Sequence, residues 1–212
     1  VEKEEVSLEE ACRKYLSLYS EKELKSKYTF SINLPHLIDA LQDTIRYGNI
    51  KLKNYKKVYS DEEVIQFSVV TLVLPDGSLV LSFSGTDGSI TGWKENLMMT
   101  YSKDLPCQIL AKDYVKETIA DIPETSYLFG LKKKKVYPKM YLTGHSKGGN
   151  LAMYAYLKNP KLQGYIEGVK SFDGPGFADG FWQGDEDVSK ITNYIPKDSI
   201  VGRVLDHREQ TK

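Results

Sequence analysis

The stretch Met140–Ala152, with the sequence MYLTGHSKGGNLA, decides the fold. It begins as an apolar strand, passes through Gly-His-Ser-Lys-Gly at 144–148 and continues with the pattern of a helix. A sharp strand-to-helix turn strains the backbone of its central residue, Ser146, and crowds together the residues two before and two after it. Only glycine fits at those two positions, which explains Gly144 and Gly148. The pattern predicts a turn that presents the Ser146 hydroxyl at the end of a strand.

Strands and helices alternate around this turn. The elements predicted there are strands at Val136–Leu142, Ile166–Phe172 and Ile191–Ile195 and helices around Ile109–Ile119 and at Gly148–Lys158. Two apolar runs, Val64–Leu74 and Ser78–Phe83, flank a Pro-Asp-Gly turn and predict an antiparallel hairpin. Alternating strands and helices imply parallel crossovers. The predicted fold class is therefore α/β, with a mainly parallel central sheet, an antiparallel hairpin and helices on both faces.

The remaining segments fit one domain over residues 1–212, with N-terminal helices at about 7–48 and a core at about 64–212. The first helix is predicted from Ser7 to about Lys27 and the second from Pro35 to Tyr47. The second should end at Gly48 in a left-handed stop. In the core, the four lysines at 132–135 predict a solvated loop.

Composition excludes several classes of function. Lys plus Arg and Asp plus Glu both number 29, so no net charge attracts nucleic acid or an anionic membrane. The longest aliphatic run, Val69–Leu74, is too short to cross a bilayer, and the acidic N-terminus lacks a secretory signal. Cys12 and Cys107 are far apart without metal-ligand spacing, which predicts reduced thiols in a cytoplasmic protein. We expect no metal and no cofactor; the sequence does not indicate an oligomeric state.

Three motifs together resemble a known family. They are GHSKGGNLA at 144–152, SFDGPGF at 171–177, and Gly-Thr-Asp followed by Gly-Trp-Lys-Glu within 85–95. These motifs resemble those of the uncharacterised bacterial α/β-hydrolase proteins related to class 3 lipases. The resemblance covers about Gln66–Arg208, and it implies the α/β-hydrolase fold and an esterase-like or lipase-like activity.

The resemblance also implies roles for single residues. Ser146 would be the nucleophile, and the backbone N–H groups of Lys147 and Thr86 would stabilise the oxyanion. Trp93 would belong to the segment that acts as a lid in the lipases. One departure is Ser84, where the related lipases usually carry Arg, so a tether of the Thr86 loop is missing from the pattern.

A serine hydroxyl needs a histidine to remove its proton and a carboxylate to orient that histidine. In these folds the chain order is serine, acid, histidine. Asp198 follows the second strand after the turn and matches the acid position of the family. Asp173, after the intervening strand, is the alternative.

The histidine is the unresolved part of the triad. His36 precedes the sheet, and the side chain of His145 should diverge from that of its neighbour Ser146. His207 remains, but if Ile200–Leu205 is a strand, about 3.3 Å per residue places it about 30 Å from Asp198. We therefore expect that the true histidine lies beyond Lys212, with His207 as the alternative within this sequence.

The sequence thus predicts a serine hydrolase that cleaves a carboxylic ester, on a small-molecule or lipid acyl substrate, through an acyl-Ser146 intermediate. No nucleic-acid partner and no integral membrane segment are expected. The alternative is a non-catalytic α/β-hydrolase-fold module for binding or regulation, which the missing histidine favours. A fluorophosphonate probe separates the two, because only an activated serine reacts with it.

Overall fold

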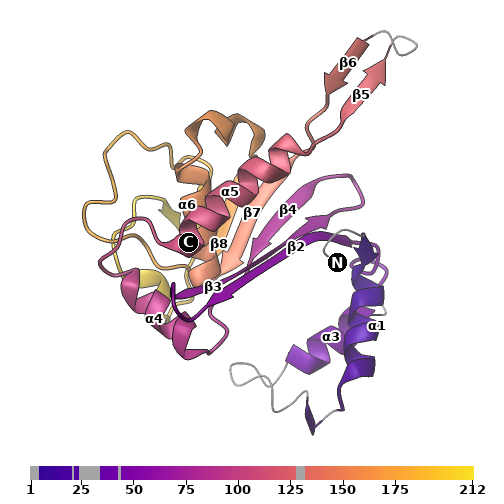
Figure 1. Cartoon of the computed structure of the whole chain (residues 1–212), viewed down its shortest axis with the longest axis horizontal. Helices are drawn as coiled ribbons and strands as arrows, with labels where there is room; N and C mark the ends of the chain where they lie inside the picture. The colour runs from indigo at the N-terminus through magenta and orange to yellow at the C-terminus, as the bar shows by residue number, and fades with distance from the viewer. Residues whose placement is uncertain (1–4, 21, 24–33, 43, 128–131) are drawn as a thin grey trace.

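The computed structural model describes residues 5–20, 22–23, 34–42, 44–127 and 132–212. Within them, eight strands form one sheet in the order β1-β2-β3-β4-β7-β8-β9-β10, and β5 and β6 form a separate pair (Figure 1). The strands are β1 Val6–Ser7, β2 Lys51–Ser60, β3 Ile65–Val73, β4 Leu79–Phe83, β5 Glu124–Tyr127, β6 Lys132–Lys135, β7 Met140–His145, β8 Gly168–Phe172, β9 Ile191–Tyr194 and β10 Gln210–Thr211. The helices are α1 Leu8–Leu18, α3 Leu34–Gln42, α4 Ile90–Met98, α5 Pro106–Ala120 and α6 Lys147–Leu157, with 3-10 helices η1 Pro160–Tyr165 and η2 Val201–Arg203.

The large sheet has an antiparallel part and a parallel part. β1 to β4 pair antiparallel, and the pairings from β4 through β7, β8 and β9 to β10 are all parallel. The predicted hairpin is β3–β4, and its turn is closed by Asp76, whose carboxylate accepts the Ser78 N–H at 2.9 Å. The α/β fold with a mainly parallel sheet and an antiparallel hairpin is confirmed. The antiparallel part is larger than predicted, because β2 and β1 extend it.

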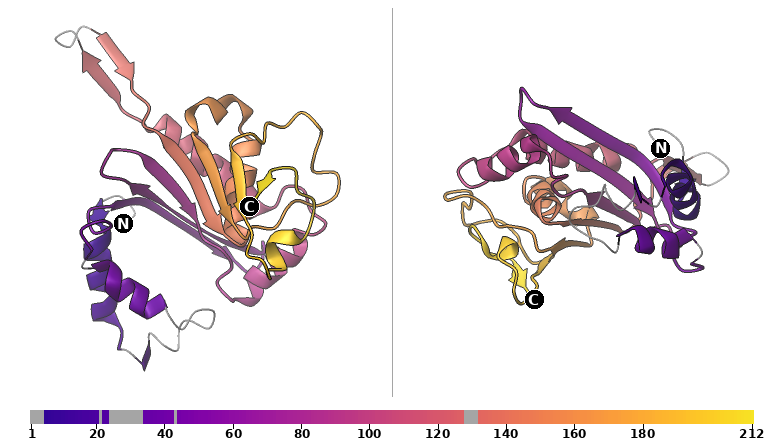
Figure 2. Two further views of the ribbon diagram at one scale, coloured as in Figure 1. Left: turned by 180° about the vertical axis from the view of Figure 1, so that it is seen from behind. Right: turned by 90° about the horizontal axis from the view of Figure 1, so that it is seen from below.

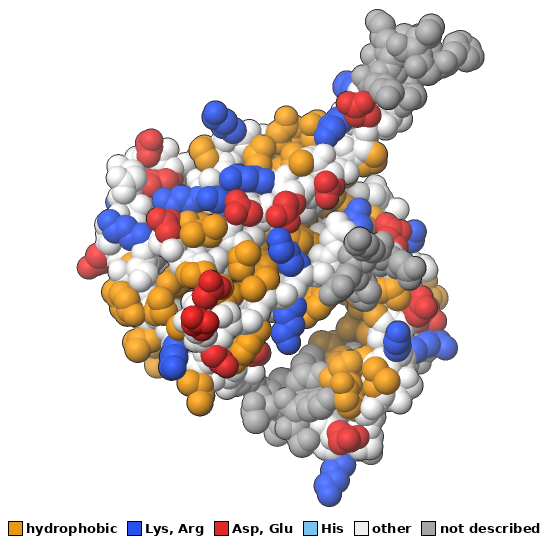
Figure 3. Space-filling model, in the orientation of Figure 1, with side chains coloured by type: hydrophobic (Ala, Val, Ile, Leu, Met, Phe, Trp, Pro, Cys, Tyr) orange, Lys and Arg blue, Asp and Glu red, His pale blue; other side chains and the backbone are white. Residues whose placement is uncertain are grey.

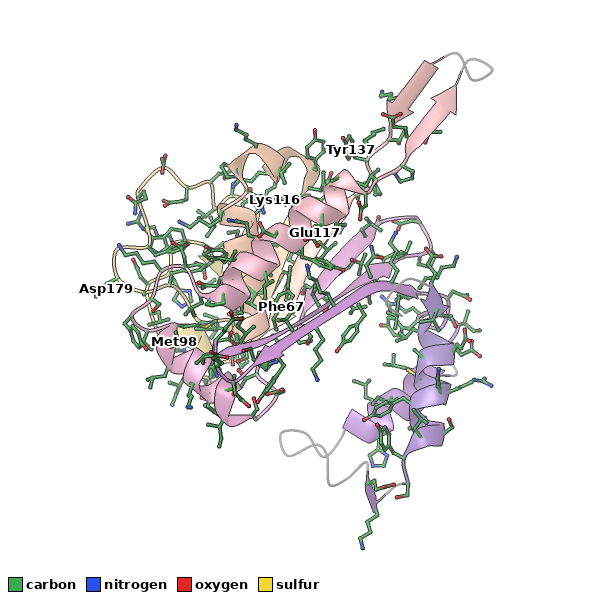
Figure 4. All side chains as sticks on the ribbon, viewed as in Figure 1. Phe67, Met98, Lys116, Glu117, Tyr137 and Asp179 are labelled. Atoms are coloured by element: carbon green, nitrogen blue, oxygen red, sulfur yellow. The ribbon has the colours of Figure 1, made fainter. Side chains whose placement is uncertain are left out.

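The core lies between the sheet and two helices. α5 and α6 contact each other, and they pack on strands β3, β4, β7 and β8. α6 is buried along its whole length, and Phe67 of β3, labelled in Figure 4, is 1% exposed beneath this layer. Cys107 at the start of α5 is buried and free, as is Cys12 of α1. This packing fixes α6, and therefore the turn that precedes it, against the middle of the sheet.

The N-terminal helices lie beside strand β1, apart from this core (Figure 2). α1 begins as predicted, since the Ser7 hydroxyl accepts the Glu10 N–H at 3.1 Å, but it ends at Leu18. The predicted left-handed stop at Gly48 is wrong, because Gly48 does not have a positive φ. A Cβ at Gly48 would instead lie 2.9 Å from the Thr44 carbonyl oxygen, so close approach explains this glycine. The rest of the first predicted helix falls largely outside the described residues.

One further prediction of secondary structure is wrong. The lysines at 132–135 are not a loop: they form β6, which pairs antiparallel with β5 and projects from the body of the molecule (Figures 1 and 2). Its register places Glu124 opposite Lys135, a pairing of opposite charges that favours a hairpin. The condition under which His207 would lie about 30 Å from Asp198 is not met, because the segment 200–205 contains the 3-10 turn η2 instead of a strand. Among the described helices, none is long and apolar enough to span a bilayer.

Candidate active site

The turn between β7 and α6 has the geometry that the sequence predicts. Ser146 has φ 54° and ψ −127°, a strained conformation for a residue with a Cβ. A Cβ on Gly144 would lie 2.3 Å from the Gly148 carbonyl carbon, and one on Gly148 would lie 2.2 Å from the Phe83 carbonyl oxygen. Both glycines are therefore required by backbone contacts. The Ser146 N–H donates to the Phe172 carbonyl at 2.9 Å, which ties the turn to the end of β8.

The first turn of α6 presents polar hydrogens beside Ser146. The Ser146 carbonyl accepts the N–H groups of Gly149 at 2.9 Å and Asn150 at 3.3 Å, so the helix begins at once after the strained residue. Lys147 is the first helical residue, and its N–H has no acceptor within the helix. The positive end of the helix dipole lies at the same place. This end of α6 is suited to hold a negatively charged oxygen.

The loop after β4 lies against the turn. A Cβ on Gly85 would lie 2.8 Å from the His145 carbonyl oxygen and 3.7 Å from the Ser146 Cβ. The next residue, Thr86, donates its hydroxyl to the Asn96 side chain of α4 at 3.0 Å. The structure therefore places the Gly85–Thr86 peptide next to Ser146, where sequence reasoning expected the second oxyanion donor.

A buried ion pair beneath the turn was not anticipated from the sequence. The Lys147 side chain is 1% exposed and pairs with Glu95 of α4, which is 0% exposed. Lys147 Nζ also donates to Gln66 of β3, to its carbonyl at 2.6 Å and its side-chain Oε1 at 2.5 Å. Cys107 lies against the pair, and its burial and then the Glu95 carboxylate raise the pKa of its thiol well above the usual value. The only sequence signal was a lysine in an otherwise buried helix start.

The two candidate acids differ in their surroundings. Asp173 is half-buried at φ 55°, and its carboxylate accepts the Ser199 hydroxyl at 2.6 Å and the Gly202 N–H at 3.0 Å. Asp198 is exposed on the loop after β9, and its carboxylate accepts no hydrogen bond from the described part of the chain. Asp173 thus fastens the loop at 199–202, and Asp198 has both oxygens available.

His207 is paired with Glu209 close by in the sequence. Its Nδ1 lies 2.6 Å from Glu209 Oε1 and its Nε2 lies 3.1 Å from the Val204 carbonyl oxygen. The hydrogen bond with Glu209 raises the pKa of His207, and the same bond lowers the pKa of the Glu209 carboxyl although burial opposes it. Both partners are hydrogen-bond acceptors, so this arrangement favours the protonated ring, in which both nitrogens donate. His36 and His145 are exposed on α3 and at the end of β7.

The outer side of α4 is apolar. Trp93 is 57% exposed and Leu97 is 66% exposed, whereas Gly92 and Glu95 on the other side are buried. Figure 3 shows exposed hydrophobic side chains between charged ones in the region of α4. Met98, labelled in Figure 4, packs against the core at the end of the helix. The segment predicted to contain a lid is therefore an amphipathic helix anchored on its inner side.

No group of three or more histidine, cysteine, aspartate or glutamate side chains in the described ranges is arranged to hold a metal ion. The acidic loop at 179–187 is instead closed by local bonds. Glu186 accepts the N–H groups of Gln183 at 2.6 Å and Gly184 at 2.9 Å. Those hydrogen bonds lower the pKa of the Glu186 carboxyl although burial opposes the shift.

Comparisons with known proteins identify the family of the chain. No curated protein is significantly similar in sequence. Among solved structures, M37 lipase is similar with 19% identity and a TM-score of 0.44, over 84% of this chain and 68% of that one. A fungal lipase in an inhibitor complex has 12% identity and a TM-score of 0.46, over 93% and 76%. The lipase of Rhizopus microsporus var. chinensis has 13% identity and a TM-score of 0.47, over 97% and 73%. The model of the Mbeg1-like family matches residues 41–212, and the chain belongs to that family.

Proposed function

We propose that the protein is a serine hydrolase that cleaves a carboxylic ester through an acyl-Ser146 intermediate. The observation that carries this proposal is the strained backbone of Ser146, at φ 54°, between two glycines that backbone contacts require. Such strain costs about 1–3 kcal/mol and persists where it serves a site. It lifts the hydroxyl out of the turn, next to the free N–H groups that begin α6.

The reaction follows from this placement. Ser146 Oγ attacks the ester carbonyl carbon and passes its proton to a base, while the carbonyl electron pair moves to oxygen. The N–H groups of Lys147 and Thr86 stabilise that oxyanion. When it collapses, the alcohol leaves with the proton from the base. A water molecule then repeats both steps on the acyl-enzyme and releases the acid, so the proposed reaction uses no cofactor.

Asp198 is the proposed acid and a histidine after Lys212 is the proposed base. The Asp198 carboxylate is exposed and accepts no hydrogen bond from the described residues, whereas each oxygen of Asp173 already accepts one. β10 runs parallel to β9, and the Ile195 N–H donates to the Lys212 carbonyl at 2.8 Å. A chain continuing in this direction approaches the edge that carries Asp198. The full coding sequence tests this assignment, and a native protein that ends at Lys212 would contradict it.

The exposed apolar side of α4 supports a substrate with an acyl chain. Ile90, Trp93 and Leu97 are 76%, 57% and 66% exposed on α4. The same helix reaches the turn through its own Glu95, which pairs with Lys147, and contacts Thr86 through Asn96. Trp93 is the proposed contact for the acyl chain, as part of a lid over the site. Rates of ester hydrolysis that do not change when the substrate aggregates would argue against that lid.

A fluorophosphonate probe on the full-length protein tests the proposal. Covalent labelling is expected in the wild type and is expected to vanish in Ser146→Ala. Ser68→Ala is the matched control, since it removes a half-buried serine hydroxyl on strand β3 without touching the turn. An unlabelled wild type would favour the non-catalytic module, which the ion-paired state of His207 also favours.

A further inference from the structure

The buried cluster of Gln66, Glu95 and Lys147 joins three segments of the active site. Lys147 Nζ has three N–H donors, and all three have partners: Glu95 Oε2, the Gln66 carbonyl at 2.6 Å and Gln66 Oε1 at 2.5 Å. The other Glu95 oxygen accepts the Gln66 N–H at 3.3 Å. The ammonium group is thus fixed between β3, α4 and the start of α6.

The lysine also determines which way the Gln66 amide faces. An ammonium group only donates, so the Gln66 atom that contacts it must be the oxygen. The amide nitrogen then points the other way, and Gln66 Nε2 donates to the Gly85 carbonyl at 3.4 Å. Without the lysine, the amide would have no reason to hold that orientation.

The Gly85 carbonyl and the Thr86 N–H belong to the same planar peptide group. In a trans peptide the two bonds point in opposite directions, and the described chain has no cis peptide. Any bond that holds the Gly85 oxygen therefore sets the direction of the Thr86 N–H. The Gln66 amide holds that oxygen from the side of the buried cluster.

We propose that the Lys147 side chain, acting through the Gln66 amide, positions the Thr86 N–H as the second oxyanion donor. Lys147 then serves both halves of the oxyanion site: its own N–H binds the oxygen, and its ammonium group aims the other donor. Glu95 keeps the ammonium group in place. This inference rests on the proposed hydrolase function, and Gln66, Glu95 and the Lys147 side chain are positioning residues in it.

Packing alone does not account for the cluster. Replacing a buried ion pair by apolar side chains is often neutral or stabilising, so the pair is weak evidence of a need for stability. The specific effect of the ion pair is to select one orientation of the Gln66 side-chain amide. A second bond, from the Thr86 hydroxyl to Asn96, holds the same loop from the adjacent position on α4.

The test uses Gln66→Met in the full-length protein. Methionine keeps the length of the side chain and leaves both backbone bonds of residue 66 intact, but it removes the amide. We expect the second-order rate of Ser146 labelling by a fluorophosphonate to fall by about 10²-fold, the lower end for the loss of one oxyanion donor. With a p-nitrophenyl ester, kcat should fall at unchanged KM. Thr71→Val is the control, because Thr71 lies on the same strand as Gln66 and makes a buried hydrogen bond with Tyr114 of α5. This variant should lower stability without slowing labelling.

A second variant tests the lysine itself. Lys147→Met with Glu95→Leu removes both charges, keeps the backbone N–H of residue 147 and frees the Gln66 amide to turn. Labelling should slow by a similar factor. Adding Gln66→Met should slow it no further, because the effects of substitutions within one hydrogen-bonded network are not additive. If Gln66→Met fails to fold, the rate at which Lys147→Met/Glu95→Leu is labelled, relative to wild type, decides the question.

The outcomes are distinct. Slow labelling of Gln66→Met beside normal labelling of Thr71→Val supports the inference. Labelling of Gln66→Met at the wild-type rate overturns the inference and leaves the hydrolase proposal intact. No Ser146-dependent labelling of the wild type overturns both.

Discussion

The strain at Ser146 makes a prediction about stability that is independent of any substrate. Ser146→Ala removes the hydroxyl but keeps a Cβ at φ 54°, whereas Ser146→Gly removes the Cβ as well. Relief of the strain is worth about 1–3 kcal/mol, and the greater freedom of unfolded glycine costs about 0.4–1 kcal/mol. We expect Ser146→Gly to be more stable than Ser146→Ala by about 0.5–2 kcal/mol. For a domain of this size that is roughly 1–8 °C in Tm.

Calorimetry and urea unfolding of the two variants measure this difference. Ser68 of β3 provides the control, because it is half-buried in an ordinary strand and has no positive φ. There the order should reverse, with Ser68→Gly less stable than Ser68→Ala by about 0.5–1 kcal/mol. If Ser146→Gly were less stable than Ser146→Ala by a similar amount, the turn would carry no strain and the main support for a nucleophile would be lost.

Three further predictions follow from the contacts around the site. Lys147→Met leaves Glu95 buried and unpaired, so unfolding free energy should fall by about 3–5 kcal/mol and recover when Glu95→Leu is added; equal stability of the two variants in calorimetry would contradict this. Gly148→Ala places a Cβ 2.2 Å from the carbonyl oxygen that ends β4, and should lower stability by about 3 kcal/mol and abolish labelling; a folded, labelled variant would refute the steric role. Because the pKa of His207 is raised in the folded state, its contribution to the free energy of unfolding is complete below pH 6.5 and disappears as pH rises through the folded-state pKa. Because the pKa of Glu209 is lowered, its contribution to the free energy of unfolding disappears as pH falls below 4.5. Urea unfolding should therefore show His207→Gln to be less stable than wild type by about 1–3 kcal/mol between those pH values, with the gap closing at higher pH; a gap that does not change with pH would be inconsistent with the ion pair.

Features that depend on residues close together in the sequence could be predicted from it. Gly144, Ser146 and Gly148 interact across one turn, so their pattern predicts a backbone that the structure confirms. The hairpin β3–β4 is also local. Strand β2 was missed because its lysines and tyrosines lie on a half-exposed surface, which hides the alternation that marks a buried strand.

Contacts between residues far apart in the sequence could not be predicted from spacing. Lys147 occupies a position that the turn motif leaves open, and its partners Gln66 and Glu95 lie 81 and 52 residues away. Nothing in the spacing connects them. His207 was judged by distance along an assumed strand, but η2 bends that segment, and its neighbour Glu209 rather than distance accounts for its state.

The two sides of helix α4 have different surroundings. Its inner side is fastened by charge to the base of the turn, and its outer side is apolar and largely unconstrained. Under the proposed hydrolase function, substitutions at Ile90, Trp93 and Leu97 should change substrate preference and leave the proposed chemistry at Ser146 unchanged. Mutational libraries restricted to those outer positions would then vary the substrate while the buried side of the helix stays intact.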